Sequence, residues 1–436
     1  MIYFLLISVL FLGVASYFIF NKDILSPTIL LIAGYMIAIL SAIINIDEWG
    51  INLHLNTVSI ILFGIFSFMI GEIIIRKIKI NIRGNNEQKI KPYKIKNYKI
   101  LIILVFQILT LILLYKEVLR IASISGDING NIMTAFRQQI TYSTDSVSRI
   151  NSLVQQMMKI NSSAGIIFLF IFVRNYIITR GIWNNIKYLF PVFLYLTQGF
   201  MQGGRGHLIK ISVIVLVVGY ITTNHLNKSK FKLSFKLFRN IIICVIAFFG
   251  IFYFSKELVG RQVEVNFLEY ITRYSGGSIQ LLDQYMQGPK ISYDGIIGAE
   301  TFPGLYGSMN KLGFTNISLI KSLEFRYTTT GIFLGNIYTG LRRFFNDFGW
   351  MGVFICQLIM SFVFNFMYKI VKISKCSKRR YNFMLLLYSY MLYCVPQQAM
   401  EDSFFISIIS VGFIVEVIIL MFMFWFITEF NVKIKL

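Results

Sequence analysis

The chain has 436 residues, of which 56% are hydrophobic, and its mean hydropathy is +0.67. This composition excludes a soluble protein with a single membrane anchor, because apolar runs of about 17–25 residues recur along the whole sequence. The formal net charge of +22 is gathered in a few segments between these runs, which favours a membrane surface over a nucleic-acid partner.

The apolar runs predict membrane-spanning helices, because backbone groups in lipid must find their hydrogen bonds within the segment. We therefore expect an all-α, polytopic integral membrane protein that forms a single membrane-embedded domain over residues 1–436. The first run lacks a basic leader and a small-residue cleavage site, so we predict a retained span rather than a signal peptide. About eleven spans are expected, at residues 2–20, 24–44, 57–75, 100–119, 163–179, 188–202, 207–224, 240–257, 349–368, 381–397 and 404–427.

The segments between the spans alternate between strongly basic and nearly neutral. Residues 76–99 hold nine Lys and Arg, residues 225–239 hold five, and residues 369–380 hold six. Basic segments next to spans remain on the cytoplasmic side, which places the N-terminus outside and the C-terminus inside. With this orientation the inner segments contain 25 basic and 3 acidic residues, and the outer segments contain 12 basic and 13 acidic residues.

Two outer segments are too long to be simple connections. Residues 121–162 form the first, and residues 258–348 form the second, which mixes apolar, charged and many aromatic side chains. A disordered segment would lack these aromatic residues, and loops of such length in compact proteins usually serve a function. We expect a folded cap of short helices over the outer ends of the spans.

A glycine-rich turn, Gly203-Gly204-Arg205-Gly206, joins the sixth and seventh predicted spans on the outer side. Glycine lets the backbone turn sharply and lets a ligand approach its amide groups. The turn holds Arg205 at the membrane boundary, where a guanidinium can bind an anionic headgroup through a fork of hydrogen bonds. A snorkelling arginine in an ordinary turn is the simpler interpretation.

Further arginines in the long outer segment indicate the same chemistry. Outer segments normally avoid basic residues, and bidentate binding of phosphate or diphosphate favours arginine over lysine. Any one of these arginines could form a surface ion pair instead, but as a set we interpret them as an anion site. They are Arg261, Arg273, Arg326, Arg342 and Arg343.

Acidic residues of the outer segments are candidates for a general base: Asp283, Asp294, Glu300, Glu324, Asp347, Glu401 and Asp402. Glu324 and Asp347 lie near arginines in the sequence, which suits either a base or a structural ion pair. His207 is a further candidate base, or else a hydrogen-bonded anchor at the membrane boundary. The sequence contains no motif for a metal site, because it has only three His and its four Cys lie in predicted spans or in a basic segment. No cofactor is predicted.

Several features together resemble the O-antigen polymerase type of oligosaccharide repeat-unit polymerase, over most of the chain. They are the spans with their late outer segment, the glycine-rich turn around Arg205, Tyr274-Ser275-Gly276-Gly277, the Asn336–Gly340 motif and Asp347-Phe348-Gly349-Trp350-Met351-Gly352. The resemblance implies a glycosyltransferase of the bacterial cytoplasmic membrane that joins lipid-linked oligosaccharides on the outer face without nucleotide sugars. It also implies that outer arginines bind the pyrophosphate of undecaprenyl carriers.

On this interpretation the donor is a growing glycan on undecaprenyl pyrophosphate, and the acceptor is a fresh lipid-linked repeat unit. The product is a surface polysaccharide such as capsule, O-antigen or exopolysaccharide. The expected partners are these two glycans, the bilayer and a regulator of chain length, with no nucleic acid, and the activated leaving group makes a metal dispensable.

Three alternatives remain open at the level of sequence. A polysaccharide ligase would need the same anion site and the same outer segment. A flippase or other transporter predicts charged residues that line mid-membrane helices. A scaffold without a catalytic role would tolerate charge reversal in the outer arginines.

Overall fold

The computed structural model describes residues 1–79, 90–124, 131–142, 149–227, 249–260, 266–289, 296–320, 322–373 and 379–430. These residues form a helical bundle with one pair of short strands, β1 (Arg326–Tyr327) and β2 (Phe333–Gly335). The strands are antiparallel, with Arg326 opposite Gly335. The all-α architecture expected from the sequence is confirmed for this part of the chain.

Eight helices of the described residues are long and apolar enough to cross a membrane, as expected for a multi-pass membrane protein. They are α1 (Ile2–Ile19), α2 (Pro27–Ile44), α3 (Leu55–Lys77), α4 (Asn97–Ser123), α6 (Ser152–Thr179), α8 (Gly206–Asn227), α12 (Leu341–Ile373) and α15 (Val411–Thr428).

The structure therefore supports eight of the eleven predicted spans. Near residues 188–202, the 3₁₀ helix η2 (Trp183–Tyr188) precedes α7 (Leu189–Met201), which has only 13 residues. Near residues 381–397, α13 (Arg379–Met391) ends early and the short α14 (Cys394–Gln397) follows. Half of the predicted span at 240–257 lies outside the described residues; residues 249–254 are helical, and the 3₁₀ helix η3 (Glu257–Val259) follows them.

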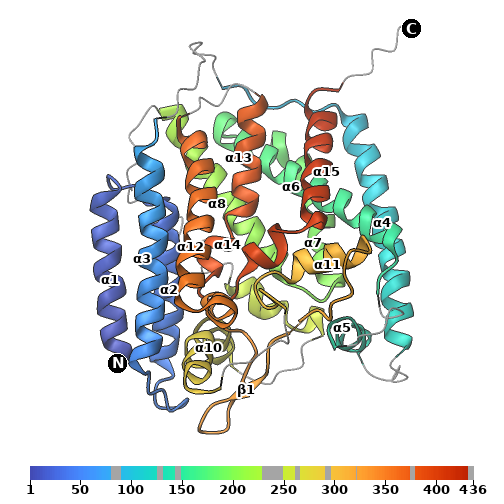
Figure 1. The fold of residues 1–436 in the computed structure, drawn as a ribbon. Coiled ribbons are helices and arrows are strands. Elements are labelled where there is room, and N and C mark those ends of the chain that lie inside the picture. The colour runs from blue at the N-terminus through green and yellow to red at the C-terminus, as the bar shows by residue number, and fades with distance from the viewer. Residues whose placement is uncertain are drawn as a thin grey trace, which may run out of the picture.

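The helix ends that lead into the basic segments lie together, at the upper end in Figure 1; they are Lys77 of α3, Asn227 of α8, Ile373 of α12 and Thr428 of α15. We call this the basic end of the bundle. The opposite end holds the N-terminus, α5 (Ile132–Tyr142), α10 (Phe267–Gln287) and β1, and we call it the cap end. Segments that the charge pattern assigns to one side of the membrane thus start from one end of the bundle.

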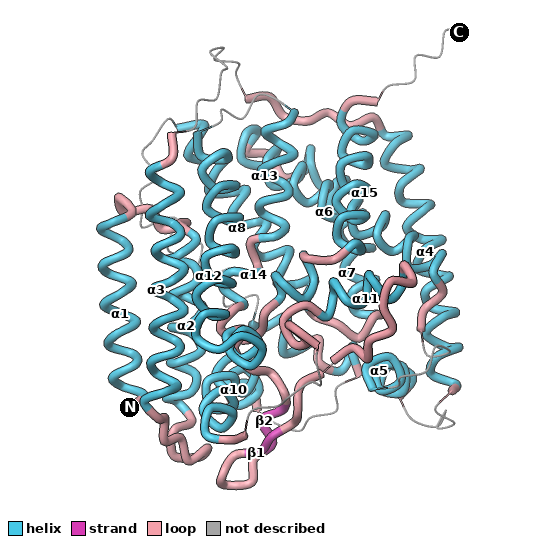
Figure 2. Tube along the Cα trace, viewed as in Figure 1, coloured by secondary structure: helices cyan, strands magenta, loops and turns pink. Residues whose placement is uncertain are grey.

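The two long outer segments contain more helix than expected. In the first, residues 152–162 are the opening turns of α6 rather than part of a loop, and α5 forms a separate helix. The second contains α10, α11 (Pro303–Lys311), the β1–β2 hairpin and the start of α12. Figure 2 shows loops of this segment gathered around the cap end. With 21 residues, α10 is longer than the short helices predicted for a cap.

α10 packs against α2 with the two backbones in contact. A Cβ atom on Gly276 would lie 2.6 Å from the amide nitrogen of Ala42, so glycine is what permits this approach. Beside it, Ser275 Oγ donates a hydrogen bond to Ser41 Oγ over 2.6 Å. The Tyr274-Ser275-Gly276-Gly277 motif therefore fixes α10 to a spanning helix.

Two later segments depart from a straight helix. α12 changes direction at Gly349, whose φ of 63° and ψ of −151° are not helical. The kink separates Arg342 and Arg343 from the spanning part, and it falls at the predicted boundary between residues 258–348 and the next span. Farther on, the π-helix η4 (Phe404–Ile408) stops before Ser410, whose hydroxyl caps α15.

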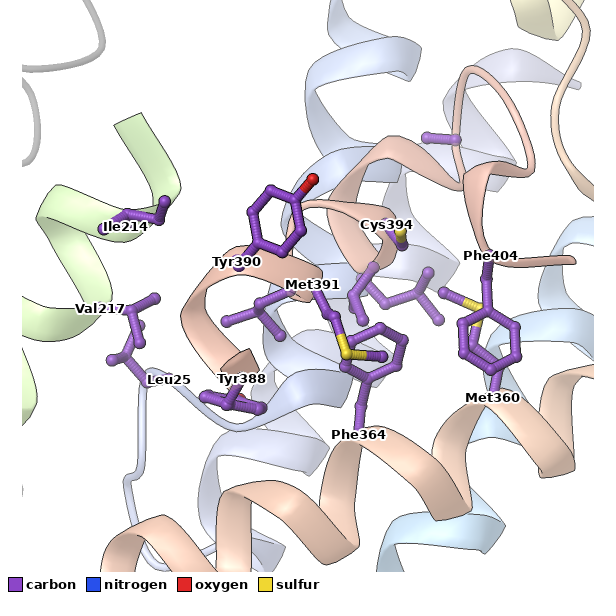
Figure 3. Close-up of a cluster of buried hydrophobic side chains, with 14 of the residues drawn as sticks. Leu25, Ile214, Val217, Met360, Phe364, Tyr388, Tyr390, Met391, Cys394 and Phe404 are labelled. Carbon is purple, nitrogen blue, oxygen red and sulfur yellow. The ribbon is translucent and has the colours of Figure 1, made fainter. Parts of the chain in front are cut away.

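One large hydrophobic cluster joins these helices, with buried side chains from Ile2 to Ile427. Figure 3 shows part of it, where Val217 of α8, Phe364 of α12 and Tyr388 of α13 lie around the same interior. A smaller cluster, which includes Leu114 and Phe136, packs α5 against α4.

Candidate functional site

The glycine-rich turn lies where α7 ends and α8 begins. Gly203 has a φ of +69°, in the left-handed region that glycine enters at low cost. A Cβ atom on Gly204 or Gly206 would meet no described atom within 4 Å, so the space beside these two residues is open. The turn therefore presents Arg205 at the cap-end terminus of a spanning helix.

Three aromatic rings enclose the guanidinium of Arg205. Its Cζ lies 3.8 Å from the ring centroid of Phe252 and 5.2 Å from those of Tyr270 and Tyr274. Nη1 donates a hydrogen bond to the Phe252 carbonyl oxygen over 2.8 Å, and only 5% of the residue is exposed. Ring faces attract a cation without neutralising its charge. We call these four residues the arginine cage.

The charge in the arginine cage has no carboxylate partner. Among the described residues, no Asp or Glu oxygen forms an ion pair with Arg205, and its buried Nη2 has no hydrogen-bond acceptor. Arg137 of α5 packs over Gly203, which adds a second positive charge nearby. Burial lowers the pKa of Arg205, the hydroxyl of Tyr270 opposes this shift, and the charge of Arg137 adds a smaller lowering. A buried cation without a partner is costly, so the cage is prepared for an anion.

The first arginine of α12 is in the opposite situation, because it is paired. Arg342 is 0% exposed, and its Nη2 lies 3.3 Å from Glu300 Oε1 and 2.5 Å from Glu324 Oε2. The rings of Tyr285 and Tyr338 lie 4.6 and 4.0 Å from its Cζ. This arginine holds two cap segments against α12.

Glu324 serves two arginines and is therefore a poor candidate for a base. Besides Arg342, its carboxylate accepts from Arg326 Nη2 over 3.0 Å. Partial burial raises the pKa of Glu324, but the hydrogen bond and charge of Arg342 outweigh it and bring the pKa below its usual value. The ion pair that the sequence offered as an alternative is present.

Asp347 and Arg343 are also engaged, but not with each other. Asp347 Oδ2 accepts from the amide and the hydroxyl of Thr301, over 2.7 and 2.6 Å. Arg343 Nη1 donates to the carbonyl oxygen of Glu300 over 2.8 Å. Of the two interpretations left open for Asp347, a base or an ion pair with the preceding arginines, the ion pair is not found among the described contacts, because the turn at residues 300–301 supplies the donors to its carboxylate.

Three other predicted residues lie apart from these groups. Arg273 pairs with Glu269 one turn earlier on α10, and Arg261 lies outside the described residues. His207 of α8 packs against Gly199 of α7, where a Cβ atom would lie 2.6 Å from its ring, and the Tyr195 ring centroid is 4.8 Å away. These contacts favour the anchoring role of His207.

Among the candidate acids that the structure describes, the carboxylate of Glu401 alone has no hydrogen bond or ion pair. The residue is exposed, but the protein next to its carboxyl group excludes part of the water. This desolvation raises the pKa of Glu401, and the charge of Arg343 opposes the shift. Glu401 is therefore the carboxylate most available to a substrate hydroxyl.

Asp402 next to it is enclosed. It is 0% exposed and accepts hydrogen bonds from the amides of Phe404 and Phe405, over 3.1 and 3.2 Å. Burial raises the pKa of Asp402 to about 7, although these bonds and Arg343 act in the other direction. Asp402 thus supports the turn that presents Glu401.

α10 connects the arginine cage to Glu401. Ser278 Oγ donates to the carbonyl oxygen of Ala399 over 2.8 Å. Ser278 follows Tyr274 by four residues, about 6 Å along the helix, and Ala399 precedes Glu401 by two. The cage and the carboxylate are thus attached to neighbouring turns. The sequence identifies Glu401 and Asp402 as candidate acids, but no local pattern predicts the contact between Ser278 and Ala399, which are 121 positions apart.

Within the described part of the chain, no three His, Cys, Asp or Glu residues are placed so that they could hold a metal ion. No family model matches the sequence, and no curated protein or solved structure matches it either. The site combines a fixed cation that has a spare donor with an accessible carboxylate, and α10 connects the two.

Proposed function

We propose that this chain polymerises undecaprenyl-pyrophosphate-linked oligosaccharide repeat units into a surface polysaccharide, on the outer face of the bacterial cytoplasmic membrane. The arginine cage is the observation that carries this proposal. A diphosphate would supply the acceptor that Arg205 Nη2 lacks, and the partly exposed ring of Tyr274 suits the apolar face of an attached sugar. The motifs that resemble repeat-unit polymerases favour this substrate among anionic lipids.

The depth of Arg205 in the bundle also supports a lipid-borne diphosphate. From this residue, α8 extends for 22 residues to the basic end, which is about 33 Å. The hydrocarbon core of a bilayer is about 30 Å thick. If the basic end faces the cytoplasm, as the charge pattern predicts, Arg205 would lie at the level of the outer headgroups, where a lipid carrier presents its phosphates.

In the proposed reaction, a hydroxyl oxygen of the acceptor attacks the anomeric carbon of the donor glycan. The hydroxyl proton passes to the carboxylate of Glu401, whose raised pKa suits a group that takes up a proton. The bond from the anomeric carbon to the pyrophosphate oxygen breaks, and its electron pair leaves with the lipid pyrophosphate. Arg205, with the charge of Arg137 nearby, stabilises the negative charge that grows on this leaving group.

The other candidate residues support the site without taking part in the reaction. Glu324 and Asp347 are occupied by protein donors, and His207 packs between helices. Arg342 neutralises the buried carboxylate of Glu300 and the partly buried carboxylate of Glu324. We therefore assign the diphosphate to Arg205, and the general base to Glu401.

The test compares variants in cells that lack the chromosomal gene. Arg205→Ala should abolish long polymer and leave single-repeat product, and Glu401→Gln should do the same without loss of donor binding. Arg120→Ala is the matched control, because it removes an arginine near the cap end of α4 that Glu117 already neutralises at 2.8 Å. Glycan length is measured by gel electrophoresis, with protein in the membrane quantified by immunoblot.

Normal polymer from a properly inserted Arg205→Ala protein would contradict the proposal. Accumulation of complete but untransferred polymer in cells without the protein would identify a ligase. Repeat units retained on the cytoplasmic face would identify a flippase. Either of these two outcomes would also overturn the assignment as a polymerase.

A further inference from the structure

A cavity of about 640 Å³ lies at the cap end, between the second half of α10, the turn at residues 50–54 and the β1–β2 hairpin. Its volume is within the range of about 300–1,000 Å³ that is typical of ligand sites. The side chains that line it are mainly amides and aromatic rings rather than cations.

Glutamines of α10 form one wall of this cavity. Gln280, Gln284 and Gln287 are four and three residues apart, so they share one face of the helix. Gln284 Nε2 donates to the carbonyl oxygen of Tyr327 over 2.8 Å. Gln280 is only 4% exposed, and its Oε1 has no hydrogen-bond donor among the described residues. A buried acceptor without a donor is costly, and a hydroxyl of a ligand would satisfy it.

Aromatic rings form the opposite wall. Phe325 and Tyr327 line the cavity although they are 41% and 59% exposed. Phe325 stacks on Phe333 of the hairpin, with 5.8 Å between ring centroids and 19° between planes. Large exposed rings beside a polar cavity indicate a ligand that has both apolar faces and polar edges.

A histidine held by a carboxylate completes the lining. Asp283 accepts from the amide of His54 over 2.8 Å, from its Nδ1 over 3.0 Å and from Thr57 Oγ1 over 2.6 Å. Because Nδ1 faces the carboxylate, the neutral ring carries its proton there and Nε2 remains an acceptor. The His54 side chain is 51% exposed and can offer this acceptor to a hydroxyl.

The charge of the cavity distinguishes it from the arginine cage. Arg326 lines it, but Glu324 neutralises this cation at 3.0 Å, and the carboxylate of Asp283 also lines the cavity. The cavity thus offers no spare positive charge for a diphosphate. It offers amides, an imidazole nitrogen and ring faces, which together match a polyhydroxylated, uncharged ligand.

We infer that this cavity binds sugar residues of the glycan, away from its diphosphate. The inference rests on the proposed function, and it assigns Arg326 to the glycan rather than to the pyrophosphate. Gln284 follows Tyr274 by ten residues, which is about 15 Å along α10. A single glycan can therefore extend from the arginine cage along this helix into the cavity.

The experiment measures binding apart from turnover. Oligosaccharides released by mild acid from the surface polysaccharide of the producing cells are titrated into purified protein in nanodiscs, by calorimetry. Gln280→Leu and Tyr327→Ala should each weaken binding by about tenfold, the loss expected when a buried polar group or a ring contact is removed. Phe314→Ala is the control, because Phe314 is an exposed ring (74%) outside the cavity and should leave the affinity within about twofold.

Gln284→Ala provides a second variant on the exposed part of the same wall, and monodisperse elution verifies that each variant is folded. Failure of the wild-type protein to bind these oligosaccharides, or equal affinity in folded cavity variants, would overturn the inference. Arg205→Ala separates it from the proposed function, because the uncharged oligosaccharides should bind this variant normally. If the wild-type protein binds the oligosaccharides and the cavity variants bind them more weakly, but the protein makes no polymer, the inference about the cavity stands and the proposed polymerase function is refuted.

Discussion

The contact between α10 and α2 predicts opposite effects for two adjacent glycine-to-alanine substitutions. A Cβ atom at position 276 would lie 2.6 Å from the nitrogen of Ala42 and 2.7 Å from the carbonyl carbon of Ser41, about 1 Å closer than an ordinary contact. Both atoms belong to helix backbone, so relief requires movement of a whole helix. At position 277 the nearest described atom is Leu334 Cδ2, at 3.7 Å, which is an ordinary contact.

The two substitutions gain the same helix propensity, about 1 kcal/mol, so their difference isolates the steric cost. Overpacking of this kind typically costs about 1–3 kcal/mol. Gly277→Ala should therefore be as stable as the wild type or more so, and Gly276→Ala should be less stable than Gly277→Ala by about 1–3 kcal/mol. The assay is unfolding by SDS in bicelles, followed by tryptophan fluorescence. Equal midpoints for the two variants would refute the backbone contact described here.

Two further predictions concern buried charge. Arg342→Ala should destabilise the protein by about 3–5 kcal/mol, because it removes a fully buried cation that lies 3.3 Å from the buried carboxylate of Glu300, whereas Arg326→Ala, at a partly exposed residue, should cost at most about 1 kcal/mol in the same assay. Asp402 has a pKa of about 7 in the folded protein and about 3.9 when unfolded, so the folded state binds the proton more tightly and stability should fall as the pH rises from about 4 to about 7. Asp402→Asn should flatten this part of the pH profile, and an unchanged slope would contradict the burial of the carboxyl.

Hydrophobicity and charge were sufficient to predict the all-α membrane fold and the grouping of the basic helix ends. They were insufficient for counting spans, because apolar composition does not show where a helix starts or breaks. Residues 188–202 are apolar enough to span, but their α-helix begins only at Leu189 and stops before the glycine-rich turn. α10 was predicted as part of a cap of short helices, since Arg273 and Asp283 lower its hydropathy. Glycine contacts and hydrogen bonds hold it against α2 and α3 instead.

The candidate site was predictable where one residue was anomalous by itself. A guanidinium in a glycine-rich outer turn identifies Arg205, and the structure describes it without a carboxylate partner. The roles of the acids depend on contacts between distant segments. Glu300 meets Arg342 across 42 positions, and this kind of pairing decides which carboxylates are occupied and leaves Glu401 available. No local pattern in the sequence carries that information.

The contacts that fix the early helices join residues from opposite parts of the chain. Ser41 and Ser275 are 234 positions apart, and Ser361, which donates to the Phe68 carbonyl oxygen, is 293 positions away from it. During biosynthesis α2 and α3 therefore enter the membrane long before their partners exist. Lipid or the insertion machinery must cover their faces until α10 and α12 emerge from the ribosome. Both contacts can therefore form only after the C-terminal half of the chain has been synthesised.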